Sequence, residues 1–206
     1  MPRMAGDANP PGTTVPHDHF DRLYADKPDP WNLATSWYER RKYALTVASL
    51  PKAQYHSGFE LGCAIGELTR LLASRCEQLL AVDCAARAVT QARRAVAEFG
   101  QVQVKRANLP ADLPGGRHDL IVASEILYYF CAEDLDQLLR GLADRLEPGG
   151  DIVAVHHRAR DRCYGYDGYN VHGTLTSRPE LTGLVHHEDE HFVLDVLRRR
   201  ERHPSR

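Results

Sequence analysis

One segment, residues 57–69 with the sequence SGFELGCAIGELT, combines an acidic residue with closely spaced small residues. The pattern predicts a β-strand, a tight turn and the start of a helix. A turn built from Gly62, Ala64 and Gly66 would let the backbone approach a ligand, and the helix would offer it free N–H groups. The carboxylate of Glu60 suits an ammonium or a hydroxyl rather than a phosphate. The segment predicts a nucleotide-like site, although its composition alone fits a purely structural turn equally well.

The spacing of these small residues argues against a dinucleotide. A dinucleotide fingerprint has glycine at its first, third and sixth positions. Counted from Gly62, the third position is Ala64, the sixth is Glu67, and Gly66 is at the fifth. Asp83 ends the next apolar run, close to the interval of roughly 20 residues at which an acid contacts ribose hydroxyls. The two features together favour a ribose-containing ligand without a pyrophosphate.

Apolar runs alternate with amphipathic segments along most of the chain, which predicts a parallel sheet with helices on both faces. The predicted buried strands after the first one are residues 78–83, 102–105, 119–124 and 151–155. The turn Glu147-Pro148-Gly149-Gly150 should separate a helix from the last of these strands. Residues 184–188 and 192–197 have hairpin spacing, so the final strand should run antiparallel to its neighbour.

The N-terminal part of the chain differs in composition from the rest. Residues 1–16 are rich in proline and glycine and predict a disordered tail, as do residues 201–206 at the other end. Residues 17–200 form a single predicted domain, in which residues 17–51 make a helical cover. Ser36 and Glu39 have capping-box spacing and predict a helix start. The tryptophans of this cover, Trp31 and Trp37, suit either packing against the sheet or a lid over a ligand.

Ligands of open α/β sheets bind beyond the carboxyl ends of the strands, where polar residues gather here. The candidate catalytic residues at these ends are Glu125, Tyr128, His156 and His157. Successive side chains of a strand point to opposite faces, so at most one of the two histidines should act as a base. Glu125 is better suited to orienting a substrate or the following loop. The polar aromatic stretch of residues 164–172 suits a sugar or an amine, or is a surface loop.

Bulk composition excludes several functions. The net charge of −2 over 206 residues argues against a general nucleic-acid or anionic-membrane binder. The chain has five cysteines and lacks a Cys-x-x-Cys pair and a signal peptide, so we expect reduced thiols and a cytoplasmic protein. Its apolar runs fall short of the ~20 residues of a membrane helix. Neighbouring histidines on a strand cannot share one ion, so we expect no metal site.

Several of these motifs together resemble class I S-adenosylmethionine (SAM) methyltransferases. Residues 60–66 match motif I, with Ala64 in place of its middle glycine, and Val82-Asp83 match motif II. Asn108-Leu109 match the place where the family contacts the adenine. Matches around the fourth strand (residues 118–121) and before the fifth (residues 146–150) complete the pattern. The resemblance implies a Rossmann-like, doubly wound sheet of seven strands, mostly parallel with the last strand antiparallel.

A narrower resemblance is to the nodulation-type N-methyltransferases (NodS-like). It is carried by Trp31, residues 36–39, residues 60–64, residues 124–129 and Val171-His172. Those enzymes methylate the free amine of a de-N-acetylated chitooligosaccharide. The resemblance implies SAM as cofactor, S-adenosylhomocysteine (SAH) as product, and a small-molecule or oligosaccharide acceptor, without nucleic-acid or membrane partners.

The alternatives to N-methylation of an amino sugar are O-methylation of a hydroxyl, which needs a stronger base, and SAM binding without turnover. The oligomeric state stays open. In the cover, Tyr38 or Arg41 could reach the carboxylate of the cofactor. The expected cofactor-binding residues are Trp37, Tyr38, Arg41, Glu60, Gly62, Cys63, Ala64, Gly66, Asp83, Cys84, Asn108, Leu109 and Ser124.

Overall fold

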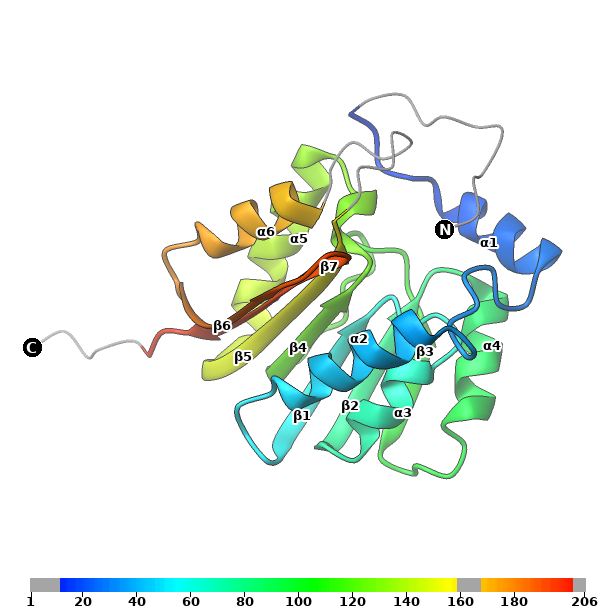
Figure 1. The fold of residues 1–206 in the computed structure, drawn as a ribbon, viewed down its shortest axis with the longest axis horizontal. Helices are drawn as coiled ribbons and strands as arrows, with labels where there is room; N and C mark the ends of the chain where they lie inside the picture. Colours follow the sequence, from blue (N-terminus) through cyan, green and yellow to red (C-terminus); the bar gives the residue numbers. More distant parts are fainter. Residues whose placement is uncertain (1–11, 159–167, 202–206) are drawn as a thin grey trace, which may run out of the picture.

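The computed structural model describes residues 12–158 and 168–201. Seven strands form one sheet in the order β3-β2-β1-β4-β5-β7-β6 (Figure 1). The strands β1 to β5 are parallel, and β7 runs antiparallel to both β5 and β6. The predicted sheet is confirmed. The strand bounds are β1 Tyr55–Leu61, β2 Cys76–Asp83, β3 Val102–Arg106, β4 His118–Ser124, β5 Leu146–His157, β6 Leu181–Glu188 and β7 Phe192–Arg199.

Helices cover both faces of the sheet. One face packs against α2 and α3, and α4 covers the β2–β3 side through small residues. The other face packs against α5 and α6 through a continuous apolar core (Figure 1). None of the described helices is long and apolar enough to cross a bilayer. The helix bounds are α1 His17–Asp26, α2 Trp37–Ala48, α3 Glu67–Ala73, α4 Ala86–Ala95, the 3₁₀ turn η1 Leu127–Tyr129, α5 Ala132–Arg145 and α6 Gly168–Thr176.

The order of the strands in the sheet determines where a ligand-binding crevice can form. β1 lies between β2 and β4, so the chain crosses to opposite sides of the sheet after β1 and after β3. At such a switch point the loops at the carboxyl ends diverge and leave a crevice. The motif after β1, the acid that ends β2 and the polar segment after β4 therefore meet at one edge of the sheet.

Two boundaries differ from the sequence prediction. The predicted tail of residues 1–16 includes residues that pack on the domain, because the Val15 N–H donates to the carbonyl of Tyr129 at 2.8 Å and the Val15 side chain is buried. Residues 1–11 lie outside the described part of the chain. The predicted turn at residues 147–150 is part of β5, which begins at Leu146 with a register shift against β4. The helix predicted at Ser36 begins there, since the Ser36 hydroxyl accepts the Glu39 N–H.

Candidate active site

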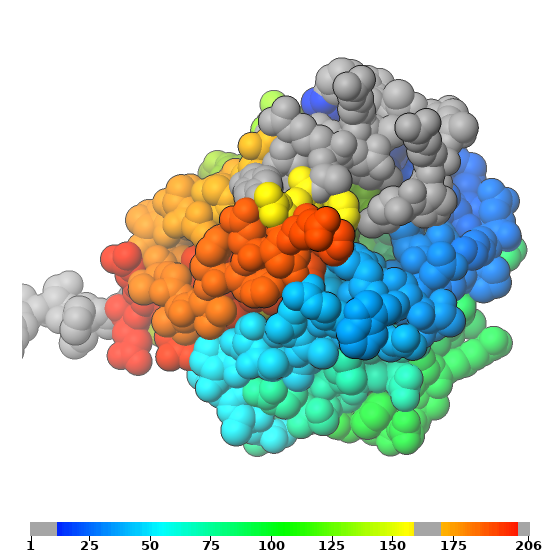
Figure 2. Space-filling view, viewed as in Figure 1, coloured from blue at the N-terminus to red at the C-terminus, as the bar shows by residue number. Residues whose placement is uncertain are grey.

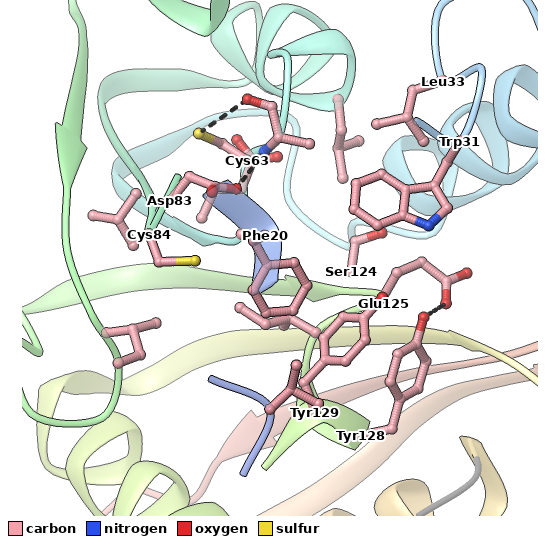
Figure 3. A pocket seen from close by; sticks show the side chains of 18 of the residues that line it. Phe20, Trp31, Leu33, Cys63, Asp83, Cys84, Ser124, Glu125, Tyr128 and Tyr129 are labelled. Carbon is pink, nitrogen blue, oxygen red and sulfur yellow. Dashed lines mark hydrogen bonds between the residues drawn. The ribbon is translucent and has the colours of Figure 1, made fainter. Parts of the chain in front are cut away.

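A cavity of about 1100 Å³, measured to its open mouth, lies at the carboxyl ends of β1, β2 and β4. Its floor comes from the sheet and its walls from the cover and from the segment after β4 (Figure 3). Many of the residues expected to bind the cofactor line it: Glu60, Gly62, Cys63, Ala64, Asp83, Cys84, Leu109 and Ser124. The expected catalytic residues Glu125 and Tyr128 line it as well. Most of the residues expected to form the site therefore line one cavity.

The turn after β1 has the unusual backbone that its small residues predicted. Gly62, Ala64 and Gly66 have φ angles of 67°, 48° and 91°, in the left-handed region. A Cβ at Gly62 would lie 2.9 Å from the Cδ1 of Ile126, so a side chain there would press into the cavity wall. Gly66 does not line the cavity. It caps α3 and packs on α4, where an added Cβ would lie 3.0 Å from the Cα of Ala92.

Asp83 ends β2 and holds the turn in place. Its Oδ2 accepts the Ala64 N–H and its Oδ1 accepts the Ala85 N–H, both at 2.9 Å. Burial raises the pKa of Asp83, although these backbone N–H groups oppose the shift. A carboxylate has about four lone-pair sites. Asp83 can therefore fix the turn and still accept hydroxyl hydrogen bonds from a ligand.

Glu60 is the most unusual acid of the cavity. Its side chain is buried at the end of β1, and its Oε2 has no hydrogen-bond partner among the described residues. Burial raises the pKa of Glu60 to about 7, and the nearby charge of Asp83 adds to the shift. A buried, unpartnered carboxylate oxygen on a cavity wall fits a ligand that brings a positive charge or a donor. The amino-acid end of SAM carries such an ammonium, so these residues fit that cofactor.

Glu125 has the opposite electrostatic environment. Its Oε1 accepts from the Lys42 Nζ at 2.6 Å, and its Oε2 accepts from the His157 N–H at 2.9 Å. Its Oε2 also accepts from the Tyr128 hydroxyl at 2.7 Å (Figure 3). Burial alone would raise the pKa of Glu125, but the Lys42 charge and the hydrogen bonds from Lys42 and the His157 N–H bring it down to about 2. Its backbone is held at a φ of 55°. Glu125 is therefore a fixed anion on the cavity wall.

Lys42, which pairs with Glu125, is one of the residues of this region that the sequence did not predict. It lies on α2 with a fully buried side chain, between Glu125 and Glu39, which is 2.8 Å from its Nζ. A buried lysine is rare unless it is paired. The signal in the sequence was the i, i+3 spacing of Glu39 and Lys42 in the cover, which is also the spacing of an ordinary exposed helix pair.

Aromatic side chains from the cover and from the segment after β4 form the other walls. Trp31 packs edge-on to Tyr24 with ring centroids 5.7 Å apart, and Phe20 packs edge-on to Tyr129 at 5.0 Å. All four rings line the cavity. Residues 14–33 thus contribute several side chains to the cavity wall, and the lid interpretation of Trp31 stays a prediction. Figure 3 shows Trp31 and Leu33 on one side of the cavity and Phe20 beside Tyr129 on another.

Three residues expected to contact the cofactor, Trp37, Tyr38 and Arg41, do not line the cavity. Trp37 is 72% exposed on the outer face of α2. Arg41 forms an ion pair with Asp189 at 2.5 Å, in the turn between β6 and β7. Figure 2 shows the blue segment of α2 beside the orange-red segment of this hairpin. Tyr38 packs behind Glu125, edge-on to His157 with centroids 5.9 Å apart. The capping box correctly placed the helix, but its register turns Trp37 outward.

The two histidines of β5 do not face the cavity either. His156 is fully buried, its Nε2 accepts the Leu127 N–H at 3.1 Å, and its Nδ1 lies 3.0 Å from the Nε2 of His172. With both ring nitrogens engaged, His156 is not available as a base. His157 is half-buried against Tyr38, and burial lowers its pKa. Asn108 also falls outside the lining, while its neighbours Ala107 and Leu109 contribute to it.

Other sequence predictions concern residues outside the described part of the chain or stay untested. The aromatic stretch includes Tyr164, Tyr166 and Asp167, which lie outside the described residues. Within residues 12–158 and 168–201, no group of three histidine, cysteine or acidic side chains is arranged to hold a metal ion. The domain boundaries and the assignment of individual site residues stay predictions.

The sheet order, the reversed last strand and the cavity above the switch point define the class I methyltransferase fold. N-methyltransferase NodS from Bradyrhizobium japonicum WM9, solved in complex with SAH, has the same fold, with a TM-score of 0.80 over 90% of this chain and 98% of that one at 24% identity. A Pseudomonas syringae protein of known structure is 40% identical and matches 80% of this chain and 100% of its own, with a TM-score of 0.72.

The nodulation protein S (NodS) family matches residues 16–168, so the chain belongs to the NodS family. Nodulation protein S of Bradyrhizobium diazoefficiens is 31% identical over 135 residues, which cover 65% of this chain and 64% of that protein. Nodulation protein S of Rhizobium tropici is 28% identical over 66% of this chain and 59% of that protein. The chain thus spans less than two thirds of the length of these relatives, and the resemblance predicted from the motifs is confirmed.

The environment of Glu60 predicts a pH-dependent affinity for SAH. The raised pKa of about 7 means that Glu60 must lose a proton before it can pair with an ammonium. Binding should therefore weaken as the pH falls through 7, by about tenfold between pH 8 and pH 6. Calorimetry across this range measures the effect. Glu60→Gln should remove the pH dependence, while Asp144→Asn at an exposed position should keep it. A wild-type affinity for SAH that does not change with pH would show that Glu60 does not pair with the ammonium.

Proposed function

We propose that this protein is a SAM-dependent N-methyltransferase that acts on the amine of an amino-sugar oligosaccharide, such as a de-N-acetylated chitooligosaccharide. Membership of the NodS family supports the reaction type. The single observation that carries the proposal is the pair of acids at the cavity, Glu60 with an unpartnered buried oxygen and Glu125 as a fixed anion. A cytoplasmic location stays part of the proposal.

The residues that would hold SAM belong to the turn and to the ends of β1 and β2. Glu60 would pair with the ammonium of the amino-acid end, and Asp83 would accept hydrogen bonds from the ribose hydroxyls. Gly62 and Ala64 would let the backbone approach the cofactor, because their φ angles need little or no side chain. Leu109 would border the adenine. Its carbonyl oxygen lies 3.3 Å from the Nε2 of His17.

When bound, SAM supplies the reactive methyl group on a sulfonium, so the cofactor carries the difficult chemistry. The protein then has to orient the acceptor and exclude water. Glu125 accepts hydrogen bonds and cannot donate them at neutral pH, because its pKa is about 2. It would bind the N–H of the acceptor and stabilise the positive charge that develops on the nitrogen during transfer.

The preference for an amine over a hydroxyl follows from the weakness of the bases left for the acceptor, because Glu60, whose pKa is about 7, would already be paired with the ammonium of SAM. A hydroxyl acceptor must lose its proton in the transition state, whereas a neutral amine attacks with its lone pair and loses a proton later. Glu125 with a pKa of about 2 is a poor base, and both nitrogens of His156 are engaged. His17 lines the cavity next to Leu109, at the proposed adenine side. This set of described residues supports N-methylation.

The aromatic walls support a sugar as the acceptor. Tyr128 and Tyr129 lie next to Glu125, and Trp31 lies across the cavity from them (Figure 3). Aromatic faces pack against the apolar faces of sugar rings, while polar groups fix the orientation of the ring. An aromatic wall beside a carboxylate therefore matches a ring that carries an amine.

The acceptor can be tested with matched oligosaccharides. We expect methyl transfer from SAM to a de-N-acetylated chitooligosaccharide, detected by mass spectrometry and SAH release, and none to the fully N-acetylated oligomer. The rate at low acceptor concentration should rise with pH through the pKa of the acceptor amine, because only the neutral amine carries the attacking lone pair. Transfer to a hydroxyl of the N-acetylated oligomer would favour the O-methyltransferase. SAH binding without any turnover would favour a binding module.

The role of Glu125 can be tested by removing its charge. Glu125→Gln keeps the shape and loses the anion, so kcat should fall by about 10- to 1000-fold, as for removal of one electrostatic stabiliser. The affinity for SAH should change less than about threefold, because Glu60 and Asp83 are left in place. Glu98→Gln, at an exposed position, is the matched control and should behave as wild type. A Glu125→Gln variant with wild-type kcat would place the acceptor elsewhere.

A further inference from the structure

A buried chain of polar side chains runs behind the acceptor side of the cavity, from β7 to the turn η1. His172 on α6 lies with its Nδ1 2.5 Å from the Oδ2 of Asp195 on β7, and with its Nε2 3.0 Å from the Nδ1 of His156 on β5. The Nε2 of His156 accepts the Leu127 N–H at 3.1 Å. His156, His172 and Asp195 are all buried. The chain links four elements of the fold, β7, α6, β5 and η1, within the core.

The direction of each hydrogen bond in this chain is fixed by its two ends. The Leu127 N–H can only donate, so the Nε2 of His156 carries no proton and its Nδ1 does. That proton is donated to the Nε2 of His172, which must then carry its own proton on Nδ1 and donate it to the carboxylate of Asp195. The Leu127 N–H at one end and the Asp195 carboxylate at the other therefore require the same Nδ1–H tautomer in both neutral histidines.

The groups around the chain favour this neutral state. Burial lowers the pKa of His156 well below its ordinary value. Glu125 and Lys42, on the cavity side, act on His156 with opposite signs. At the other end, the Oδ1 of Asp195 accepts from His186 of β6 at 2.8 Å, and the His186 side chain is 61% exposed. Asp195 therefore has a solvent-facing partner as well as a buried one.

The chain is not a path for the proton of the acceptor. It ends on a backbone amide, which does not release its proton, and His156 does not line the cavity. Its end point is instead the first residue of η1, which forms part of the cavity wall. In that wall the Tyr128 hydroxyl donates to Glu125, and the Tyr129 carbonyl accepts the N–H of Val15, which lies just before the cover. Holding Leu127 in place therefore also holds Tyr128, which donates to Glu125, and Tyr129, to which Val15 is hydrogen-bonded.

We propose that Asp195, His172 and His156 are positioning residues that hold η1, and with it Tyr128 and Glu125, in the geometry that methyl transfer requires. The proposal rests on the proposed function for its kinetic consequence. Misplacement of a substrate-orienting group by about 1 Å can cost about 100-fold in rate, so a core hydrogen bond remote from the reacting atoms can matter for turnover.

The proton arrangement can be tested without turnover. Nitrogen-detected NMR of the wild-type protein should show both His156 and His172 as neutral Nδ1–H tautomers at pH 7. The Leu127 amide should exchange slowly with solvent in wild type and in His156→Gln, whose side-chain oxygen can still accept it, and quickly in His156→Leu. Nε2–H tautomers, or equal exchange of this amide in all three proteins, would overturn the proposal.

The kinetic test compares the same two variants. His156→Leu should lower kcat about 10- to 100-fold, while His156→Gln should stay within about fivefold of wild type, and SAH affinity should change less than about threefold in both. The same contrast is expected for His172→Leu and His172→Gln, which provides a second pair if one variant fails to fold. Glu98→Gln, at an exposed position outside the chain, is the control and should leave kcat unchanged.

A purely structural chain would give a different pattern. If Gln and Leu variants lose activity equally, or only in proportion to the fraction of unfolded protein measured by circular dichroism, the positioning role is wrong. A wild-type protein that shows the expected tautomers and slow Leu127 exchange but transfers no methyl group would contradict the proposed function, and leave the fixing of η1 supported.

Discussion

The site depends on one buried ion pair, between Lys42 of α2 and Glu125 after β4. Lys42 is fully buried and also contacts Glu39, so one cation lies between two carboxylates. Burying these charges is costly, and only close geometry and additional hydrogen bonds compensate for the cost. The pair ties the N-terminal cover to the carboxyl edge of the sheet. It also keeps Glu125 ionised in a position where burial alone would favour the neutral acid.

The two acids of the cavity gain different properties from their surroundings. Among the described residues no cation pairs with Glu60, and its pKa rises to about 7, whereas Glu125 pairs with Lys42 and its pKa falls to about 2. In the proposed reaction, Glu60 meets a charge that the cofactor brings, and Glu125 meets a charge that develops on the acceptor. Pairs of carboxylates with opposite shifts are a common way for one site to give two acids different roles.

The sequence predicted those features of the structure that depend on the residue types within a short segment. The glycine-rich turn, Asp83 and the alternating elements follow from backbone freedom, strand ends and periodicity, and they placed the sheet and most of the cavity floor correctly. Lys42, Phe20, Tyr24 and Tyr129 were missed because their role comes from packing between distant segments. His156 was misjudged because a strand-end histidine looks the same in sequence whether it faces a cavity or, as here, completes a buried chain to Asp195.

The most direct test of this account is a crystal structure of the protein with SAH and a de-N-acetylated chitooligosaccharide. We expect the SAH ammonium beside Glu60 and the acceptor amine within hydrogen-bond distance, about 3 Å, of the Glu125 carboxylate. The amine nitrogen should face the SAH sulfur across the space that a methyl group would occupy. An acceptor whose amine lies away from Glu125, with another polar group of the sugar facing the sulfur, would contradict the central claim that Glu125 selects an amine for methylation.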